Sequence, residues 1–123
     1  MSFSNVTKGQ NFRFGFYDVP SSERLKLIKE AGFDQTMFWW GDEFEDTDGS
    51  RFDLYDCAVK NGLDVVTCHF PSTNAHWLWM DGEEGKSYVK QFDSACKECG
   101  ERKIKYLVLH LTRKLITAEP NQK

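Results

Sequence analysis

The feature that most constrains the fold is a junction that occurs three times, each time joining a helix pattern to an apolar run. Its copies read KEAGFDQTMF (29–38), VKNGLDVVTC (59–68) and KECGERKIKYLVL (97–109). Each copy has a lysine near the helix end, where a positive charge interacts favourably with the helix dipole. Each also has a glycine (Gly32, Gly62 or Gly100) that can take the left-handed conformation in which many helices end. A strand–helix unit that recurs every roughly 30 to 40 residues predicts consecutive βαβ units in a parallel sheet.

This repeat predicts four strands and three helices in a single α/β domain. Apolar and aromatic runs predict strands at 12–18, 33–40, 63–70 and 104–112. Apolar residues three and four positions apart predict helices at 20–32, 51–62 and 85–100. We therefore place the domain at 12–112, with an N-terminal extension over 1–11 and a C-terminal tail over 113–123.

Two architectures contain consecutive βαβ units. If the strands follow one another in sequential order, right-handed crossovers place every helix on the same side of the sheet, as in the wall of a TIM barrel. An open doubly wound sheet is the alternative, but the segment FYDVPSSER after the first strand lacks the G-x-G-x-x-G fingerprint. A complete barrel has about 250 residues, whereas this chain has 123. We therefore expect the N-terminal half of a (β/α)8 barrel, whose unpaired strand edges favour a homo-oligomer.

Composition narrows the classes of partner. The net charge is −3 with both signs mixed along the chain, whereas nucleic-acid-binding domains usually carry a basic patch. No apolar stretch approaches the ~20 residues that span a bilayer, and the segment MSFSNVTKGQ lacks the apolar core of a signal peptide. We therefore expect a cytoplasmic chain that binds neither nucleic acid nor membrane. Its four cysteines are expected to be reduced, and the CKEC segment (96–99) is interpreted as helix packing.

Polar residues follow the ends of the expected strands. Asp18 follows the first strand, and Trp40 and Glu43 follow the second. His69 and His110 stand at the ends of the third and fourth. Carboxyl ends of barrel strands meet at the mouth, and neighbouring strands lie about 4.8 Å apart. Two imidazoles at adjacent strand ends could therefore reach one metal ion, although a packing role for both histidines is the alternative.

The motifs VVTCHFP and YLVLHLT resemble those of the xylose isomerase-like TIM barrels, over about residues 12–112. That superfamily contains sugar-phosphate isomerases and epimerases, inositol-catabolism enzymes and zinc-dependent apurinic endonucleases. The resemblance implies that His69 and His110 line the site and bind a divalent metal, manganese or zinc. In the family, carboxylates from the fifth to eighth strands complete the metal shell, and these have no counterpart here. Asp18 and Glu43 are the nearby candidates in this chain.

The resemblance implies a metal-dependent isomerase or epimerase of a sugar or sugar phosphate. In such an enzyme a carboxylate moves a proton next to a carbonyl group, and in this superfamily that carboxylate normally lies in the second half of the barrel. We therefore expect the chain to be inactive alone. An apurinic endonuclease-like hydrolase and a non-catalytic sugar-binding or assembly module are the alternatives.

Aromatic rings at a barrel mouth can stack on sugar rings, so tryptophans are expected among the substrate contacts. We assign Trp40, Trp77 and Trp79 to substrate binding, together with Asp18 and Glu43. Strand alternation allows only one of Trp39 and Trp40 to face the site. For Trp77 and Trp79, packing as a cover over the barrel rim is the alternative.

Overall fold

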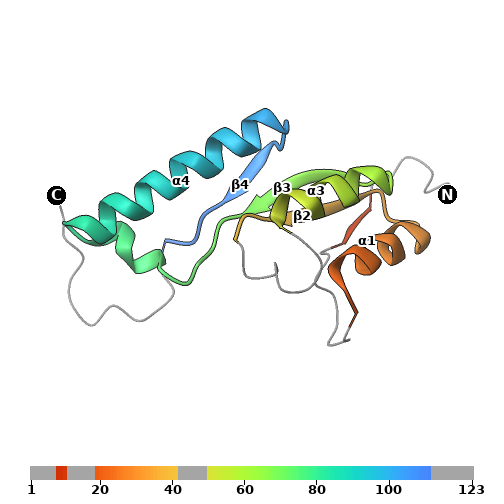
Figure 1. The fold of residues 1–123 in the computed structure, drawn as a ribbon, viewed down its shortest axis with the longest axis horizontal. Coiled ribbons are helices and arrows are strands. Elements are labelled where there is room, and N and C mark those ends of the chain that lie inside the picture. Colours follow the sequence, from red (N-terminus) through yellow and green to blue (C-terminus); the bar gives the residue numbers. More distant parts are fainter. Residues whose placement is uncertain (1–7, 11–18, 42–49, 112–123) are drawn as a thin grey trace, which may run out of the picture.

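The computed structural model describes residues 8–10, 19–41 and 50–111. Its elements alternate between strand and helix, as the repeat predicts, and Figure 1 shows their arrangement. The strands are β1 (Gly9–Gln10), β2 (Gln35–Trp39), β3 (Asp64–His69) and β4 (Tyr106–Val108). The helices are α1 (Ser21–Glu30), α3 (Arg51–Lys60), the 3-10 helix η1 (Ala75–Trp79) and α4 (Glu83–Glu101).

The four strands form one parallel sheet in the sequential order β1-β2-β3-β4. This confirms the predicted α/β class with parallel strands, and the sheet is open within the described part of the chain. Its first strand begins earlier than expected, because Gly9 and Gln10 already pair with β2, inside the segment 1–11 that we assigned to an extension. The strand expected at 12–18 lies outside the described residues.

The fourth strand is shorter than the predicted range 104–112. Val108 pairs with His69, the last residue of β3. Because β3 ends at His69, β4 has no paired residue in β3 beyond Val108 and ends there. This places His110 just past the end of the sheet.

All three helix-to-strand junctions share one hydrogen-bond pattern. Gly32 and Gly62 take positive φ angles of 91° and 76°, which confirms the predicted left-handed caps. At the third junction the prediction of Gly100 is wrong: α4 continues to Glu101, and Lys103 takes the left-handed position with φ of 57°. Its amide donates to the carbonyl of Gly100 and the next amide donates to Cys99, which repeats the bonding of the first two junctions. The register of this motif, and not the glycine, determines where the helix ends.

The three helices pack on one face of the sheet through a shared core. In Figure 1, α3 lies across β2 and β3. One core cluster combines Leu25 and Ile28 of α1, Leu54 and Ala58 of α3, Cys99 of α4, and Phe38, Val65 and Cys68 of the sheet. A second cluster consists of Phe70, which follows β3, and of Tyr88 and Ala95 of α4. Trp77 and Leu78 of η1 pack against it. A shared core on one face fits the same-side crossovers that the sequential strand order predicts.

An irregularity in the β2–β3 pairing determines which side chains share the opposite face. Thr36 pairs with Val65, but Met37 pairs with Thr67, so Val66 is an extra residue in β3. After this bulge Phe38 pairs with Cys68, and Trp39 pairs with His69. Cys68 therefore faces the helices, where it is fully buried, and His69 faces the other side.

No helix among the described residues has the length and hydrophobicity that crossing a membrane requires.

Candidate functional site

His69 and His110 lie side by side at the carboxyl edge of the sheet. The centroids of their imidazole rings are 6.1 Å apart, with 40° between the ring planes. His69 ends β3, and His110 follows β4 by two residues. The adjacency expected from parallel strand ends is therefore present in the structure.

Trp39 is the third ring of this group. Its indole is nearly parallel to the His69 imidazole, with 8° between the planes and 6.1 Å between the centroids. The two residues are register partners on β2 and β3, so the sheet itself positions this stack. Trp39, His69 and His110 thus form a row along the carboxyl ends of β2, β3 and β4.

The surroundings of His69 favour its neutral form. Burial lowers the pKa of His69, and the nearby charge of His110 lowers it further. A neutral imidazole has a free lone pair, and this is the form that binds metal ions. The electrostatics of His69 are therefore compatible with a ligand role.

The pair does not by itself complete a metal site. Among residues 8–10, 19–41 and 50–111, no group of three or more histidine, cysteine or carboxylate side chains is placed to hold a metal ion. Asp18 and Glu43, the carboxylates that we assigned to this mouth, lie outside those ranges. Because a catalytic zinc usually has three protein ligands, the pair supplies part of a ligand set.

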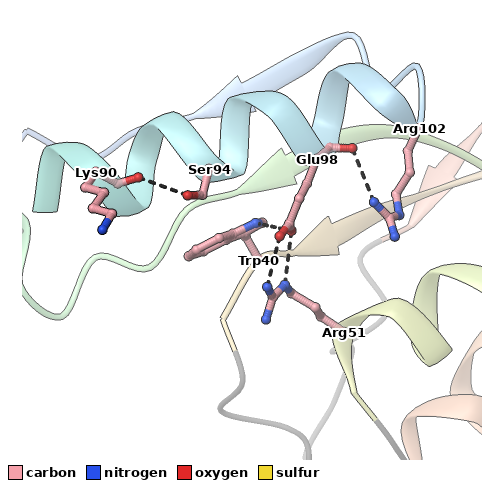
Figure 2. A network of polar contacts seen from close by, with 6 residues as sticks. All are labelled: Trp40, Arg51, Lys90, Ser94, Glu98 and Arg102. Carbon is pink, nitrogen blue, oxygen red and sulfur yellow. Dashed lines mark hydrogen bonds and ion pairs between the residues drawn. The ribbon is translucent and has the colours of Figure 1, made fainter. Parts of the chain in front are cut away.

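Trp40 lies on the other side of the sheet, under α4 (Figure 2). Its indole N–H donates to Glu98 Oε2 over 2.6 Å, and its ring stacks on Phe70 at 5.3 Å. The Arg51 guanidinium lies 4.7 Å from the ring centroid and pairs with the same carboxylate. Only one of the two adjacent tryptophans accompanies the histidines, as alternation requires, but it is Trp39 and not Trp40, because the register pairs Trp39 with His69.

The loop tryptophans occupy two different positions, both in η1. Trp77 packs against the second core cluster and lines a pocket of about 270 Å³ together with Phe70 and Tyr88. Neither His69 nor His110 lines this pocket. Trp79 is 40% exposed, and its indole N–H donates to the carbonyl of Leu111 over 2.7 Å. It therefore anchors the segment that carries His110, while its contact with a substrate stays a prediction.

A groove of about 460 Å³ leads away from His69 along the face of the sheet opposite α1, α3 and α4. Its lining includes Gln35 and Met37 of β2, Thr67 of β3 and Tyr106 of β4. Sequence reasoning did not select these residues, because it considered only strand ends. The alternation of side chains along the strands, together with the bulge, places them below the histidines.

The CKEC segment lies near the end of α4, as expected. Cys99 is buried in the core and Cys96 is exposed. Of the other two cysteines, Cys68 is buried and Cys57 is half-buried, and none of these four described residues is in a disulfide.

Comparison with known proteins gives no match for this chain among family models, curated proteins or solved structures. The parallel α/β sheet and its alternating helices are thus the level at which the fold is established.

Proposed function

We propose that His69 and His110 are two ligands of a divalent metal site at the mouth of a xylose isomerase-like barrel, which acts on a sugar or sugar phosphate. The observation that carries this proposal is the adjacency of the two imidazoles, 6.1 Å between centroids, at equivalent ends of neighbouring parallel strands. Parallel α/β folds place their ligands at such carboxyl ends.

The two imidazoles fit zinc better than manganese, which prefers oxygen ligands. Imidazole nitrogen suits zinc, and the depressed pKa of His69 keeps its lone pair available near neutral pH. A bound metal would polarise the carbonyl and hydroxyl oxygens of a keto sugar. This chain contributes the two imidazoles, the Trp39 ring that orients one of them, and the groove below them.

Isomerisation or epimerisation also needs a group that moves a proton at the carbon next to the carbonyl. In the part of the chain that the structure describes, no carboxylate joins the histidines. We therefore propose that the two histidines bind metal weakly by themselves, and that turnover requires a carboxylate from outside the described residues, supplied by a partner.

We propose a second copy of the chain as that partner. The described sheet has two edge strands, β1 and β4, and the exposed ring of Tyr106 lies on the second of them. Parallel sheets are almost always covered on both faces and avoid long free edges. Pairing of the β4 edge with the β1 edge of another copy would continue the same parallel order.

Native mass spectrometry of the chain with zinc or manganese tests the metal site and the assembly together. The variants are His69→Ala and His110→Ala, and His76→Ala is the matched control, because it removes the third histidine of the chain, which lies in η1. We expect both strand-end variants to lose the metal and the control to retain it. Equal metal binding by all four proteins would contradict the proposal.

The mass of the metal-bound species then reports the assembly. We expect a dimer in which sugar-phosphate turnover, followed by NMR of the interconverting sugars, depends on the metal. A dimer that binds sugar without turnover would point to the non-catalytic module, and a stable monomer would contradict the role of a second copy.

A further inference from the structure

The pocket of about 270 Å³ lies between three elements: the loop that follows β3, the 3-10 helix η1, and α4. Phe70 and Tyr88 line it and are only 1% and 3% exposed, so these two rings form its floor. Trp77 of η1 adds a third aromatic ring to the lining. Because neither His69 nor His110 takes part, this pocket is separate from the proposed metal site.

Close packing of η1 on α4 fixes the shape of the pocket. A Cβ at Gly85 of α4 would lie 3.2 Å from the carbonyl oxygen of Trp77, so the backbones of the two helices are in direct contact. The amide of Trp77 donates to the carbonyl of Asn74 over 2.9 Å, and the amide of Ala75 donates to the carbonyl of Ser72 over 3.1 Å. The loop and η1 are thus held in place, and a preorganised pocket loses less conformational entropy when it binds a ligand.

The polar groups of the lining are neutral. They are the side-chain amides of Asn74 and Gln91 and the hydroxyls of Thr73 and Tyr88. Asn74 precedes η1, but its side chain makes no capping hydrogen bond. The amide nitrogen of the Gln91 side chain donates to Ser87 Oγ over 3.3 Å, which leaves the carbonyl oxygen of that side chain as an acceptor. None of the described residues that line the pocket carries a formal charge, so an anionic or cationic ligand would find no counter-ion among them.

The hydroxyl of Tyr88 lacks a hydrogen-bond partner. It is buried, and no group of the described residues bonds to it. Buried polar groups in folded proteins are nearly always paired, and an exception indicates a water or a ligand that completes the pairing. Burial also raises the pKa of Tyr88, so the phenol stays protonated and can both donate and accept. Tyr88 therefore brings an unmet hydrogen-bonding capacity to the floor of the pocket.

We propose that this pocket binds a neutral, hydroxyl-rich molecule of the size of a monosaccharide. Sugar hydroxyls donate and accept hydrogen bonds, and the amides and hydroxyls of the lining offer both kinds of partner. The aromatic rings of the lining supply an apolar surface for the C–H face of a sugar ring. The volume lies just below the range of about 300–1,000 Å³ that is usual for ligand pockets, which fits one sugar ring. This inference does not depend on the proposed metal site.

NMR titration of the folded, full-length chain, labelled with 15N, tests the proposal. The probes are D-glucose and D-galactose, each compared with its own 6-phosphate. We expect a neutral sugar to shift the indole N–H of Trp77 and the backbone amides around Gln91, and its phosphate to bind more weakly. The proposal would be overturned by the absence of any shift, by tighter binding of the phosphates, or by shifts confined to Thr67 and Tyr106 in the groove below His69.

Two variants assign the binding to this pocket. Tyr88→Phe keeps the ring on the floor and removes only the hydroxyl, so we expect the affinity for the sugar to fall about 2- to 10-fold with no decrease in the urea midpoint. Gln91→Ala removes an exposed amide at the rim and should weaken binding to a similar extent.

Each variant has a matched control that should retain the affinity. Tyr106→Phe removes the hydroxyl of a tyrosine that lines the groove below His69 instead of this pocket. Ser94→Ala changes a residue of α4 outside the lining, whose hydroxyl donates to the carbonyl of Lys90. Unchanged affinity in both Tyr88→Phe and Gln91→Ala, or an equal loss in the controls, would contradict the assignment.

Discussion

Removing the carboxylate of Glu98 should destabilise the protein more than any other single change on the surface of α4. This carboxylate accepts the indole N–H of Trp40 over 2.6 Å and two guanidinium contacts from Arg51, of 3.2 and 3.1 Å. Figure 2 shows that these contacts join α4 to the end of β2 and the start of α3. The network therefore connects three elements that are far apart in the sequence.

The expected magnitude follows from burial. Hydrogen bonds to charged groups contribute about 1.5–3 kcal/mol each when shielded from water, but contributions of neighbouring bonds do not add. The Arg51 and Glu98 side chains are 16% and 22% exposed, so solvent screening reduces their interaction only partly. We expect Glu98→Ala to lower the free energy of unfolding by about 2–4 kcal/mol. Glu98→Gln, which retains an acceptor for the indole but loses the charge, should cost about half as much.

Urea denaturation followed by tryptophan fluorescence and far-UV circular dichroism measures these differences. Glu101→Ala is the matched control, because it removes an exposed glutamate from the next turn of the same helix, and it should change stability by less than about 0.5 kcal/mol. If Glu98→Ala costs no more than this control, the network does not hold α4 on the sheet, and our account of that junction is refuted.

Two further predictions concern the glycines of α4 and the charge state of His69. A Cβ at Gly85 would collide with the carbonyl oxygen of Met80, whereas a Cβ at Gly100 meets nothing within 4 Å. In the same urea titration, Gly85→Ala should therefore destabilise the protein by about 1–3 kcal/mol, and Gly100→Ala should stabilise it by about 0.5–1 kcal/mol. Equal effects would show that the packing of η1 on α4 is not as described. The depressed pKa of His69 means that the unfolded chain binds the extra proton more readily, so stability should decrease as the pH falls below about 6.5, and His69→Ala should reduce this slope in titrations at successive pH values. Metal affinity should decrease over the same range, because protonated imidazole has no lone pair to donate, and a flat affinity would exclude His69 as a ligand.

The repeat in the sequence was sufficient to predict the class of fold. Helix periodicity and the recurring junction located α1, α3 and α4 and the three strands that follow them, because these signals are local. Parallel order followed from connection lengths, since each connection contains a helix. The prediction ended α4 at Gly100 because a glycine, a local signal, often ends a helix. The spacing between the helix and Ile104, the buried apolar residue that follows the cap, is the better guide to where α4 ends.

The composition of the site depended on tertiary structure. The sequence predicted that His69 and His110 would be neighbours, because the carboxyl ends of adjacent parallel strands meet. It did not predict that Trp39 would join them and that Trp40 would turn to Glu98, because that choice depends on register. One extra residue in β3, Val66, shifts the pairing so that Trp39 is opposite His69. Without that bulge Trp39 would pair with Cys68, and the histidine and the buried thiol would exchange faces. Side chains alternate along a strand with a period of two, so a shift of one residue reverses which face each of them occupies. A bulge of this kind is a property of paired strands, and only the assembled sheet contains it.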